Sequence, residues 1–128
     1  MRKIRIIDTR DEMDFLNGLE GYASINNAGL FTVYFLKGVA PNGIQKTLLL
    51  HPEVQDLGRA TVRPITEIIY REMPNEFNGV DLFRRVASAL ERDDIYADTV
   101  FRRMRELKER GVINFECLND SKSIYKKR

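Results

Sequence analysis

The sequence has one cysteine, one histidine and no tryptophan among its 128 residues. The single thiol of Cys117 excludes an internal disulfide, and a thiolate metal cluster would need several cysteines. His51 stands alone between Leu50 and Pro52, so no catalytic dyad or histidine metal site is predicted. The glycines also lack the spacing of a phosphate-binding loop. We therefore expect no enzyme activity, no metal and no cofactor.

Long hydrophobic runs are absent as well. No apolar stretch approaches the roughly 20 residues that a membrane-spanning helix requires. The basic N-terminus is followed by too short an apolar run for a signal peptide, and acidic residues come directly after it. Together with the single cysteine, these absences favour the cytoplasm and predict no membrane partner. The hydrophobic fraction of 43% is ordinary for a globular protein of one or two small domains.

The formal net charge of +2 is unevenly distributed along the chain. Residues 1–61 hold seven basic and seven acidic side chains, whereas residues 72–98 hold three basic and seven acidic ones. Residues 99–128 hold nine basic and four acidic side chains. Positive charge gathered in one segment is typical of a surface that binds a polyanion. A solvated surface on a slightly basic protein would give the same pattern.

The basic segment begins with a predicted amphipathic helix at residues 97–110. Apolar side chains recur at Val100, Met104 and Leu107, which places them on one helical face. The opposite face is strongly cationic. Gly111 is expected to end the helix, because glycine readily takes the left-handed conformation that follows a helical C-terminus.

A β-hairpin is predicted after this helix. Apolar and polar residues alternate over 113–117, as they do in a strand with one buried face. A polar turn at 119–121 then leads to a returning strand at 123–126. The alternation places Cys117 on the inward side, so we expect a buried structural thiol.

Two further helices are predicted before the basic segment, at residues 62–73 and 79–91. Thr61 and Pro64 mark the start of the first, since proline is tolerated in the first turn of a helix. Asn78 is placed to cap the second. The order from residue 61 onward is therefore helix, short strand or loop, helix, turn, helix and hairpin.

This order resembles the winged helix-turn-helix superfamily of DNA-binding proteins. The resemblance covers residues 61–128, about half of the chain. It implies an α+β fold in which this half is a domain of three helices and a β-hairpin wing. The residues that carry the resemblance are Thr99-Val100, Arg102-Arg103, Leu107 and Glu109-Arg110-Gly111-Val112-Ile113.

The resemblance implies a double-stranded DNA-binding protein, either a small transcriptional regulator or a replication accessory. Its third helix would enter the major groove, with Arg102 and Arg103 carrying most of the affinity because arginine can bond guanine or clamp a phosphate. Glu106 could accept from cytosine or pair with a neighbouring arginine. The residues expected to contact DNA are Thr99, Arg102, Arg103, Glu106, Ser121, Lys122 and Lys126.

Acidic residues around the second helix depart from this pattern and weaken the case for DNA contact there. Winged helices also serve as protein-interaction modules, so the alternative function is an adaptor within a larger complex. No small-molecule ligand is evident. The acidic residues concerned are Asp81, Glu91, Asp93, Asp94 and Asp98.

Residues 1–60 are predicted to form a separate βαββ unit that matches no family known to us. We expect this unit to supply the contact of a homodimer, through the apolar strand at 30–36. Residues 53–60 are expected to be a connector. The predicted elements are a strand at 3–7, a helix opened by the T-x-x-E capping box at Thr9, and strands at 30–36 and 44–50.

Overall fold

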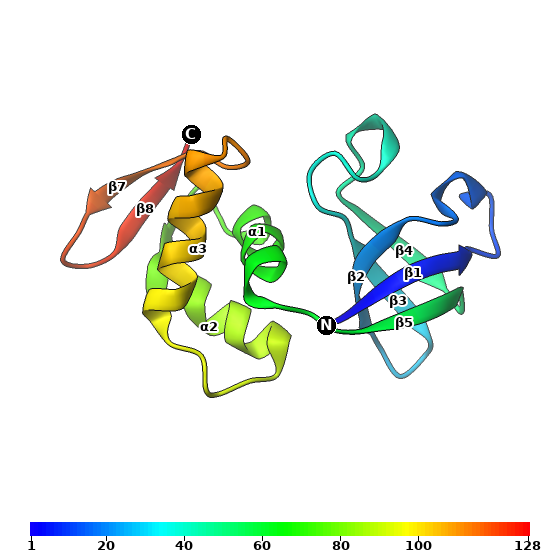
Figure 1. Ribbon diagram of the computed structural model, residues 1–128. Helices are drawn as coiled ribbons and strands as arrows, with labels where there is room; N and C mark the ends of the chain where they lie inside the picture. The colour runs from blue at the N-terminus through cyan, green and yellow to red at the C-terminus, as the bar shows by residue number, and fades with distance from the viewer. The chain divides into compact units, whose positions relative to one another are not determined.

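The computed structural model describes all 128 residues, and the chain divides into two compact units, Met1–Ala60 and Thr61–Arg128. The fold is α+β, with three α-helices and two antiparallel sheets (Figure 1). All three helices belong to the second unit. None of them is both long and apolar enough to cross a bilayer.

The first unit is a five-stranded antiparallel sheet in the order β4-β3-β2-β1-β5. Strands β1 to β4 form a meander, and β5 pairs with the free side of β1. Strands β4 and β5 are therefore the two edges of the sheet. The strands are β1 (Arg2–Asp8), β2 (Glu20–Ile25), β3 (Leu30–Tyr34), β4 (Lys46–Leu50) and β5 (Glu53–Arg59).

One face of this sheet carries the core of the first unit. Strands β3 and β4 confirm the predicted strands at 30–36 and 44–50. Alternate residues of β1 and β4 are buried, as the period of two requires, whereas β2 buries Gly21, Tyr22 and Ala23 in succession. The buried core residues are Ile4, Ile6, Leu16, Ala23, Val33, Phe35, Ala40 and Leu49.

The helix predicted to begin at Thr9 is absent, so the predicted βαββ order is wrong. Only one 3₁₀ turn, η1 (Asp14–Leu16), lies between β1 and β2. The side chain of Asp8 accepts a hydrogen bond from the backbone N–H of Arg10 at 2.8 Å, and Asn17 Oδ1 accepts from the N–H of Thr9 at 3.0 Å. These local bonds stabilise a turn, which competes with the helix that the capping box favours.

The connector predicted at residues 53–60 is also wrong, because β5 occupies most of it. This strand pairs with β1 from Arg59 opposite Arg2 to Glu53 opposite Asp8, with two register shifts. Its residues are mostly polar and show no clean alternation, so the sequence carries little strand signal. Pairing with β1 decides the conformation here, as tertiary context often does for strands.

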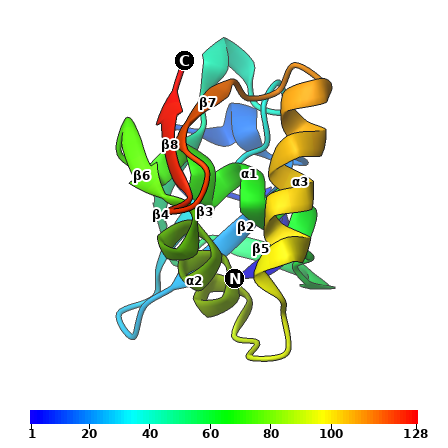
Figure 2. The same cartoon turned by 90° about the vertical axis from the view of Figure 1, so that its left-hand side faces the viewer.

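The second unit contains the helices and a three-stranded sheet in the order β6-β8-β7 (Figure 1 and Figure 2). All three predicted helices are confirmed, each within one residue of the expected ends. The returning strand β8 pairs with both β7 and the short β6 that precedes α2. The elements are α1 (Val62–Glu72), β6 (Glu76–Asn78), α2 (Gly79–Leu90), α3 (Ala97–Glu109), β7 (Phe115–Asn119) and β8 (Ile124–Lys127).

The predicted helix ends are confirmed where they rest on capping chemistry. Asn78 Oδ1 accepts from the N–H of Val80 at 2.7 Å and so caps α2. Gly111 has a φ of +74°, the left-handed conformation expected of the residue after a helix. Helices α2 and α3 bury one stripe each, as their sequence spacing predicts, whereas α1 buries six consecutive residues, Ile65 to Tyr70, on more than one face.

Four aromatic rings join α1 to the three-stranded sheet. The ring of Tyr70 meets Phe77 edge-on at a centroid distance of 5.7 Å, and Tyr125 meets Phe115 edge-on at 5.5 Å. Phe77 and Tyr125 stack at 5.7 Å. Burial of large rings in such contacts is a major source of stability in a small domain.

Cys117 is exposed, so the predicted buried thiol is wrong. The inward side of β7 is covered by the core only as far as Phe115, which is buried. Beyond it the hairpin projects away from the helices into solvent, and neighbouring Leu118 is exposed too (Figure 1). Alternation shows which side of a strand a residue lies on, but not how far the covering core extends.

Candidate nucleic-acid interface

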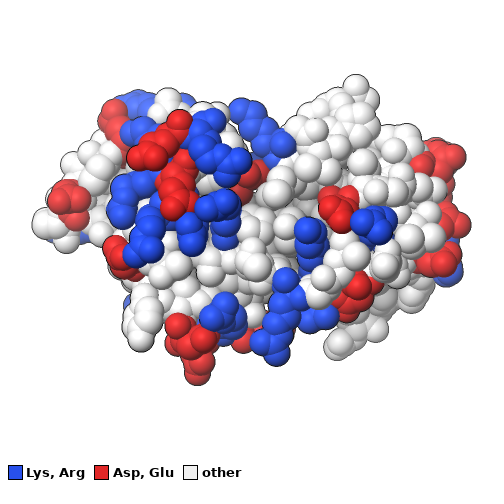
Figure 3. Space-filling model, in the orientation of Figure 1, with Lys and Arg blue, Asp and Glu red and all other residues white.

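Helix α3 positions most of the predicted contact residues. Its buried stripe of Val100, Met104 and Leu107 faces the interior of the second unit, where α3 packs against α1 and α2. This burial fixes the rotation of the helix and turns its charged residues outward. Lysine and arginine side chains gather over the region of α3, with acidic side chains running among them (Figure 3).

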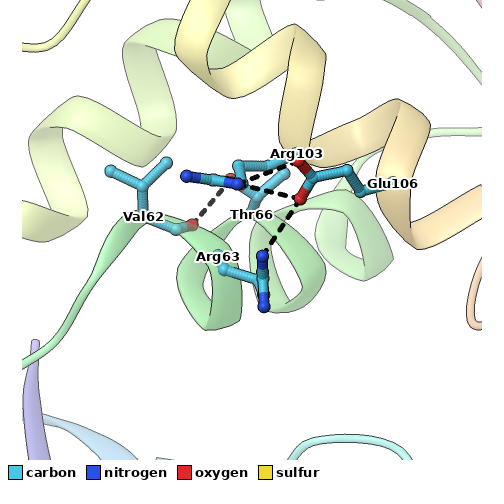
Figure 4. Close-up of polar contacts among 5 residues, drawn as sticks. All are labelled: Val62, Arg63, Thr66, Arg103 and Glu106. Carbon is cyan, nitrogen blue, oxygen red and sulfur yellow. Dashed lines mark hydrogen bonds and ion pairs between the residues drawn. The ribbon is translucent and has the colours of Figure 1, made fainter.

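Glu106 lies at the joint between α3 and α1 rather than on an open surface (Figure 4). Arg103 Nη1 donates to both carboxylate oxygens of Glu106 at 2.9 Å, and Arg63 Nη2 of α1 donates to one of them at 3.2 Å. The hydrogen bond from Arg103 is the main cause that lowers the pKa of Glu106. The carboxylate therefore stays ionised and links two helices.

Arg103 is consequently engaged within the protein. Its side chain is half-buried, and its guanidinium bonds both oxygens of one carboxylate. Contact with a base or phosphate would require that pair to break. The structure thus separates the two arginines that the sequence treats as equivalent, and it assigns Arg103 and Glu106 a place in the helix joint.

Arg102 is the more available of the two. It pairs only with Asp98, one turn earlier on α3, at 3.1 Å. The side chains are 57% and 72% exposed, and an exposed pair of this kind contributes little to stability. The guanidinium of Arg102 can therefore exchange Asp98 for a phosphate at small cost.

Arg105 was not among the predicted contacts, yet it is exposed and takes part in no ion pair. It lies on the side of α3 that faces the hairpin. Burial is the main cause that raises the pKa of Tyr125 in β8, and the positive charge of Arg105 counteracts this rise. The helical period could have identified Arg105, because it lies one turn beyond Arg102 on the solvent side.

The hairpin tip carries Ser121 and Lys122 as predicted, and both are exposed. Asn119 Oδ1 accepts from Ser121 Oγ at 2.9 Å and from the N–H of Lys122 at 3.1 Å, which shapes the turn. The ammonium of Lys122 forms no ion pair. The tip thus offers one hydroxyl and one free positive charge.

Lys126 is a weaker candidate for contact with DNA than the sequence alone suggests. Its cross-strand neighbours in the sheet are Glu116 on β7 and Glu76 on β6. Directly opposed residues share one face and have Cβ atoms about 5 Å apart, so Lys126 lies between two acidic residues, of which Glu116 pairs with Arg128. The adjacent Lys127 is structural, since its Nζ donates to the carbonyl of Met73 at 2.5 Å.

The N-terminal end of α3 places Thr99 half-buried and Tyr96 exposed. Tyr96 precedes the first residue of the helix and its side chain is 78% exposed, which is unusual for so large a ring. The exposed and unburdened groups of this surface come from α3 and the hairpin tip. They are Arg105 and Lys122, which form no ion pair, together with Arg102, whose one partner Asp98 is itself exposed.

No group of three or more histidine, cysteine or carboxylate side chains is placed to hold a metal ion. Comparison of the chain with protein-family models, curated proteins and solved structures gave no match.

Proposed function

We propose that the second unit is a winged helix that binds double-stranded DNA, in a small transcriptional regulator or a replication accessory protein. In this proposal α3 enters the major groove and the β7–β8 hairpin is the wing. The order of three helices with a hairpin supports it, as does the pairing of β8 with the strand that precedes α2.

The observation that carries the proposal is the pair of exposed guanidiniums on the solvent side of α3. Arg102 and Arg105 lie one turn apart and project from a helix whose opposite stripe is buried. The free ammonium of Lys122 extends the positive charge along the hairpin. Arginine side chains on one helix face suit bidentate contact with guanine or with phosphate oxygens.

A salt titration of DNA binding tests this proposal. Fluorescence anisotropy of a labelled random-sequence duplex should report weak binding that falls steeply with salt, since each phosphate contact contributes a slope of about −0.9 in log K against log salt. Replacement of both Arg102 and Arg105 by alanine should weaken binding by roughly 10- to 100-fold and reduce the slope by about 2.

A double variant of Arg10 and Arg59 is the matched control, because it removes the same charge from exposed positions of the first unit. It should leave the slope unchanged. Equal losses in the two double variants would show that only net charge matters, and no binding at low salt would overturn the proposal. Selection of bound sequences from a random DNA pool would then give the target site.

The acidic surface beside α3 favours a second candidate, a protein-interaction adaptor. Glu91, Asp93 and Asp94 are exposed at the approach to the helix, and Arg92 neutralises only Asp94, at 2.9 Å. Carboxylates near a phosphate backbone repel it. Binding to DNA that is absent or indifferent to Arg102 and Arg105 would favour this adaptor.

A further inference from the structure

The first unit has two edge strands, β4 and β5, and they differ in how well each could pair with a strand of another molecule. Strand β4 pairs with β3 on one side only. An unpaired strand edge presents a row of backbone donors and acceptors that another strand can bind. Natural proteins usually block such an edge with charges, bulges or a covering segment.

Hydrogen bonds at the two ends of β4 show which of its residues face β3. The N–H of Phe35 donates to Gln45 at 2.9 Å, and the N–H of His51 donates to Gly29 at 2.9 Å. Both pairs continue the register of the β3–β4 ladder. Because backbone groups alternate in direction along an antiparallel strand, odd-numbered residues bond to β3 and even-numbered ones point outward.

Leu48 and Leu50 therefore direct their N–H and C=O groups toward the open edge. Their side chains lie on the outer face of the sheet and are 57% and 61% exposed. Leu49 between them is fully buried in the core. The edge combines free backbone hydrogen-bonding groups with two exposed leucines.

Strand β5, at the other edge of the sheet, has the features by which proteins usually prevent pairing with another strand. Asp56 is held by an ion pair with Arg2 at 3.0 Å, and the pairing with β1 shifts register twice. Gly58 has a φ of +107°, which no regular strand contains. Charge and irregularity make this edge a poor template for another strand.

We propose that two copies of the chain associate by antiparallel pairing of β4 with β4. A two-fold axis at Leu49 places Leu48 of each copy opposite Leu50 of the other. This register uses the outward N–H and C=O of both leucines in about four main-chain hydrogen bonds. It also brings the exposed side chains together on one face, where they exclude water from each other.

The charges permit this pairing. Lys46 is the one charged residue of β4. In the proposed register the two copies of Lys46 lie at opposite ends of the seam, roughly 20 Å apart at 3.4 Å per residue. That separation exceeds the Debye length of about 8 Å at physiological salt, so repulsion is small.

A second copy is the favoured occupant because the edge complements itself about the two-fold axis. The strand that the sequence favoured for this role, β3, lies between β2 and β4 and has no free edge. The seam is smaller than the roughly 1,200 Å² of a stable interface, so we expect a reversible dimer with a Kd on the order of tens of micromolar. This inference does not depend on DNA binding.

Sedimentation equilibrium of the full chain over a range of concentrations tests the dimer. The unmodified chain should fit a monomer–dimer equilibrium. Leu48→Lys and Leu50→Lys should each raise the Kd by more than about tenfold, because they place charge at the seam. Leu48→Pro should do the same through the backbone, since it removes an outward N–H that the fold does not use.

Ile25→Lys is the matched control. Ile25 is an equally exposed aliphatic residue, at 52%, but it ends β2, which lies inside the sheet. Its substitution should leave the Kd unchanged. A monomer at several hundred micromolar, a Leu48→Lys variant that still dimerises, or an Ile25→Lys variant that dissociates equally would each overturn the proposal. Circular dichroism of all variants should show a retained fold.

Discussion

The two units differ in what they bury, ten hydrophobic residues in the first and fourteen in the second, and they also expose different chemistry. The first unit has seven basic and seven acidic residues, and it leaves six large apolar side chains exposed. The second has three such side chains and concentrates its positive charge on α3 and the hairpin. Exposed apolar surface suits contact with protein, whereas ordered positive charge suits a polyanion. The contrast is consistent with our two proposals, self-association through the first unit and DNA binding through the second.

The interiors differ as well. The first unit relies on one five-stranded sheet, and Phe35 is the largest of its fully buried side chains. The second relies on three amphipathic helices and a ring cluster that ties α1 to the sheet. Substitutions that affect one interior should therefore leave the function of the other unit intact.

The largest effect is expected from Phe35→Ala. Removal of a fully buried ring from the first unit should lower its free energy of unfolding by about 3–5 kcal/mol. Hydrogen exchange read residue by residue should show faster opening of β1 to β5, with protection in α1, α2 and α3 retained. Equal loss of protection in the helices would show that the two units unfold as one, and the division of roles would then need revision.

Gly79→Ala should have the next largest effect, in the second unit. A Cβ at this position would lie 2.8 Å from the ring of Phe101 and 2.9 Å from that of Tyr125. Such overpacking costs about 1–3 kcal/mol, even though alanine favours a helix. Urea unfolding should detect the loss, and Ser88→Ala at an exposed position of the same helix should change stability by less than about 0.5 kcal/mol.

The two units also differ in how well their elements could be predicted from the sequence. Helices α1, α2 and α3 carry their own signals, namely a 3.6-residue apolar period and end caps such as Asn78 and Gly111. Strand β5 carries almost none, because its conformation depends on β1, about 50 residues earlier in the chain. Local chemistry around Asp8 and Asn17 likewise overrode an apparent capping box.

In the candidate site, too, some features follow from the local sequence and others depend on tertiary structure. The sequence identified α3 and the hairpin tip, because charge and period are local properties. It could not show that Glu106 pairs with Arg103 rather than with Arg102, a choice that goes with the contact of Glu106 to Arg63 of α1. Nor could it foresee that Glu116 and Glu76 flank Lys126, because strand register is a tertiary property.

Tyr70→Phe should have a moderate effect that depends on pH. The hydroxyl of Tyr70 donates to the carbonyl of Asn114 at 2.6 Å, and its loss should cost about 1 kcal/mol at neutral pH. Burial raises the pKa of Tyr70 from 10.0 to about 12. Stability that depends on the neutral phenol is present below pH 10 and is lost as the pH rises toward 12. Urea unfolding across this range should therefore show the variant and the unmodified chain converging.

Glu106→Gln should have the smallest effect on stability. How the stability of this variant changes with pH tests whether Glu106 links α3 to α1. Hydrogen bonding by Arg103 lowers the pKa of Glu106 below the ordinary 4.5. Because the pKa of Glu106 is lower in the folded state than in the unfolded state, its ionised carboxylate stabilises the fold above the unfolded-state pKa. That stabilisation is lost as the pH falls through the folded-state pKa. Urea midpoints should thus fall less on acidification in the variant than in the unmodified chain. Arg102→Ala, which touches only an exposed pair, should leave this acid-side slope unchanged.

The same variant tests whether Glu106 reads a base. A residue confined to the α1–α3 joint should leave the sequence preference of DNA binding unchanged when its charge is removed. A carboxylate that accepts from cytosine would instead lose discrimination at one base pair, by about 1–3 kcal/mol. Anisotropy measured on a selected site and on its single-base variants distinguishes these outcomes. Loss of discrimination with an unchanged acid-side slope would move Glu106, and Arg103 with it, from the helix joint to the DNA surface.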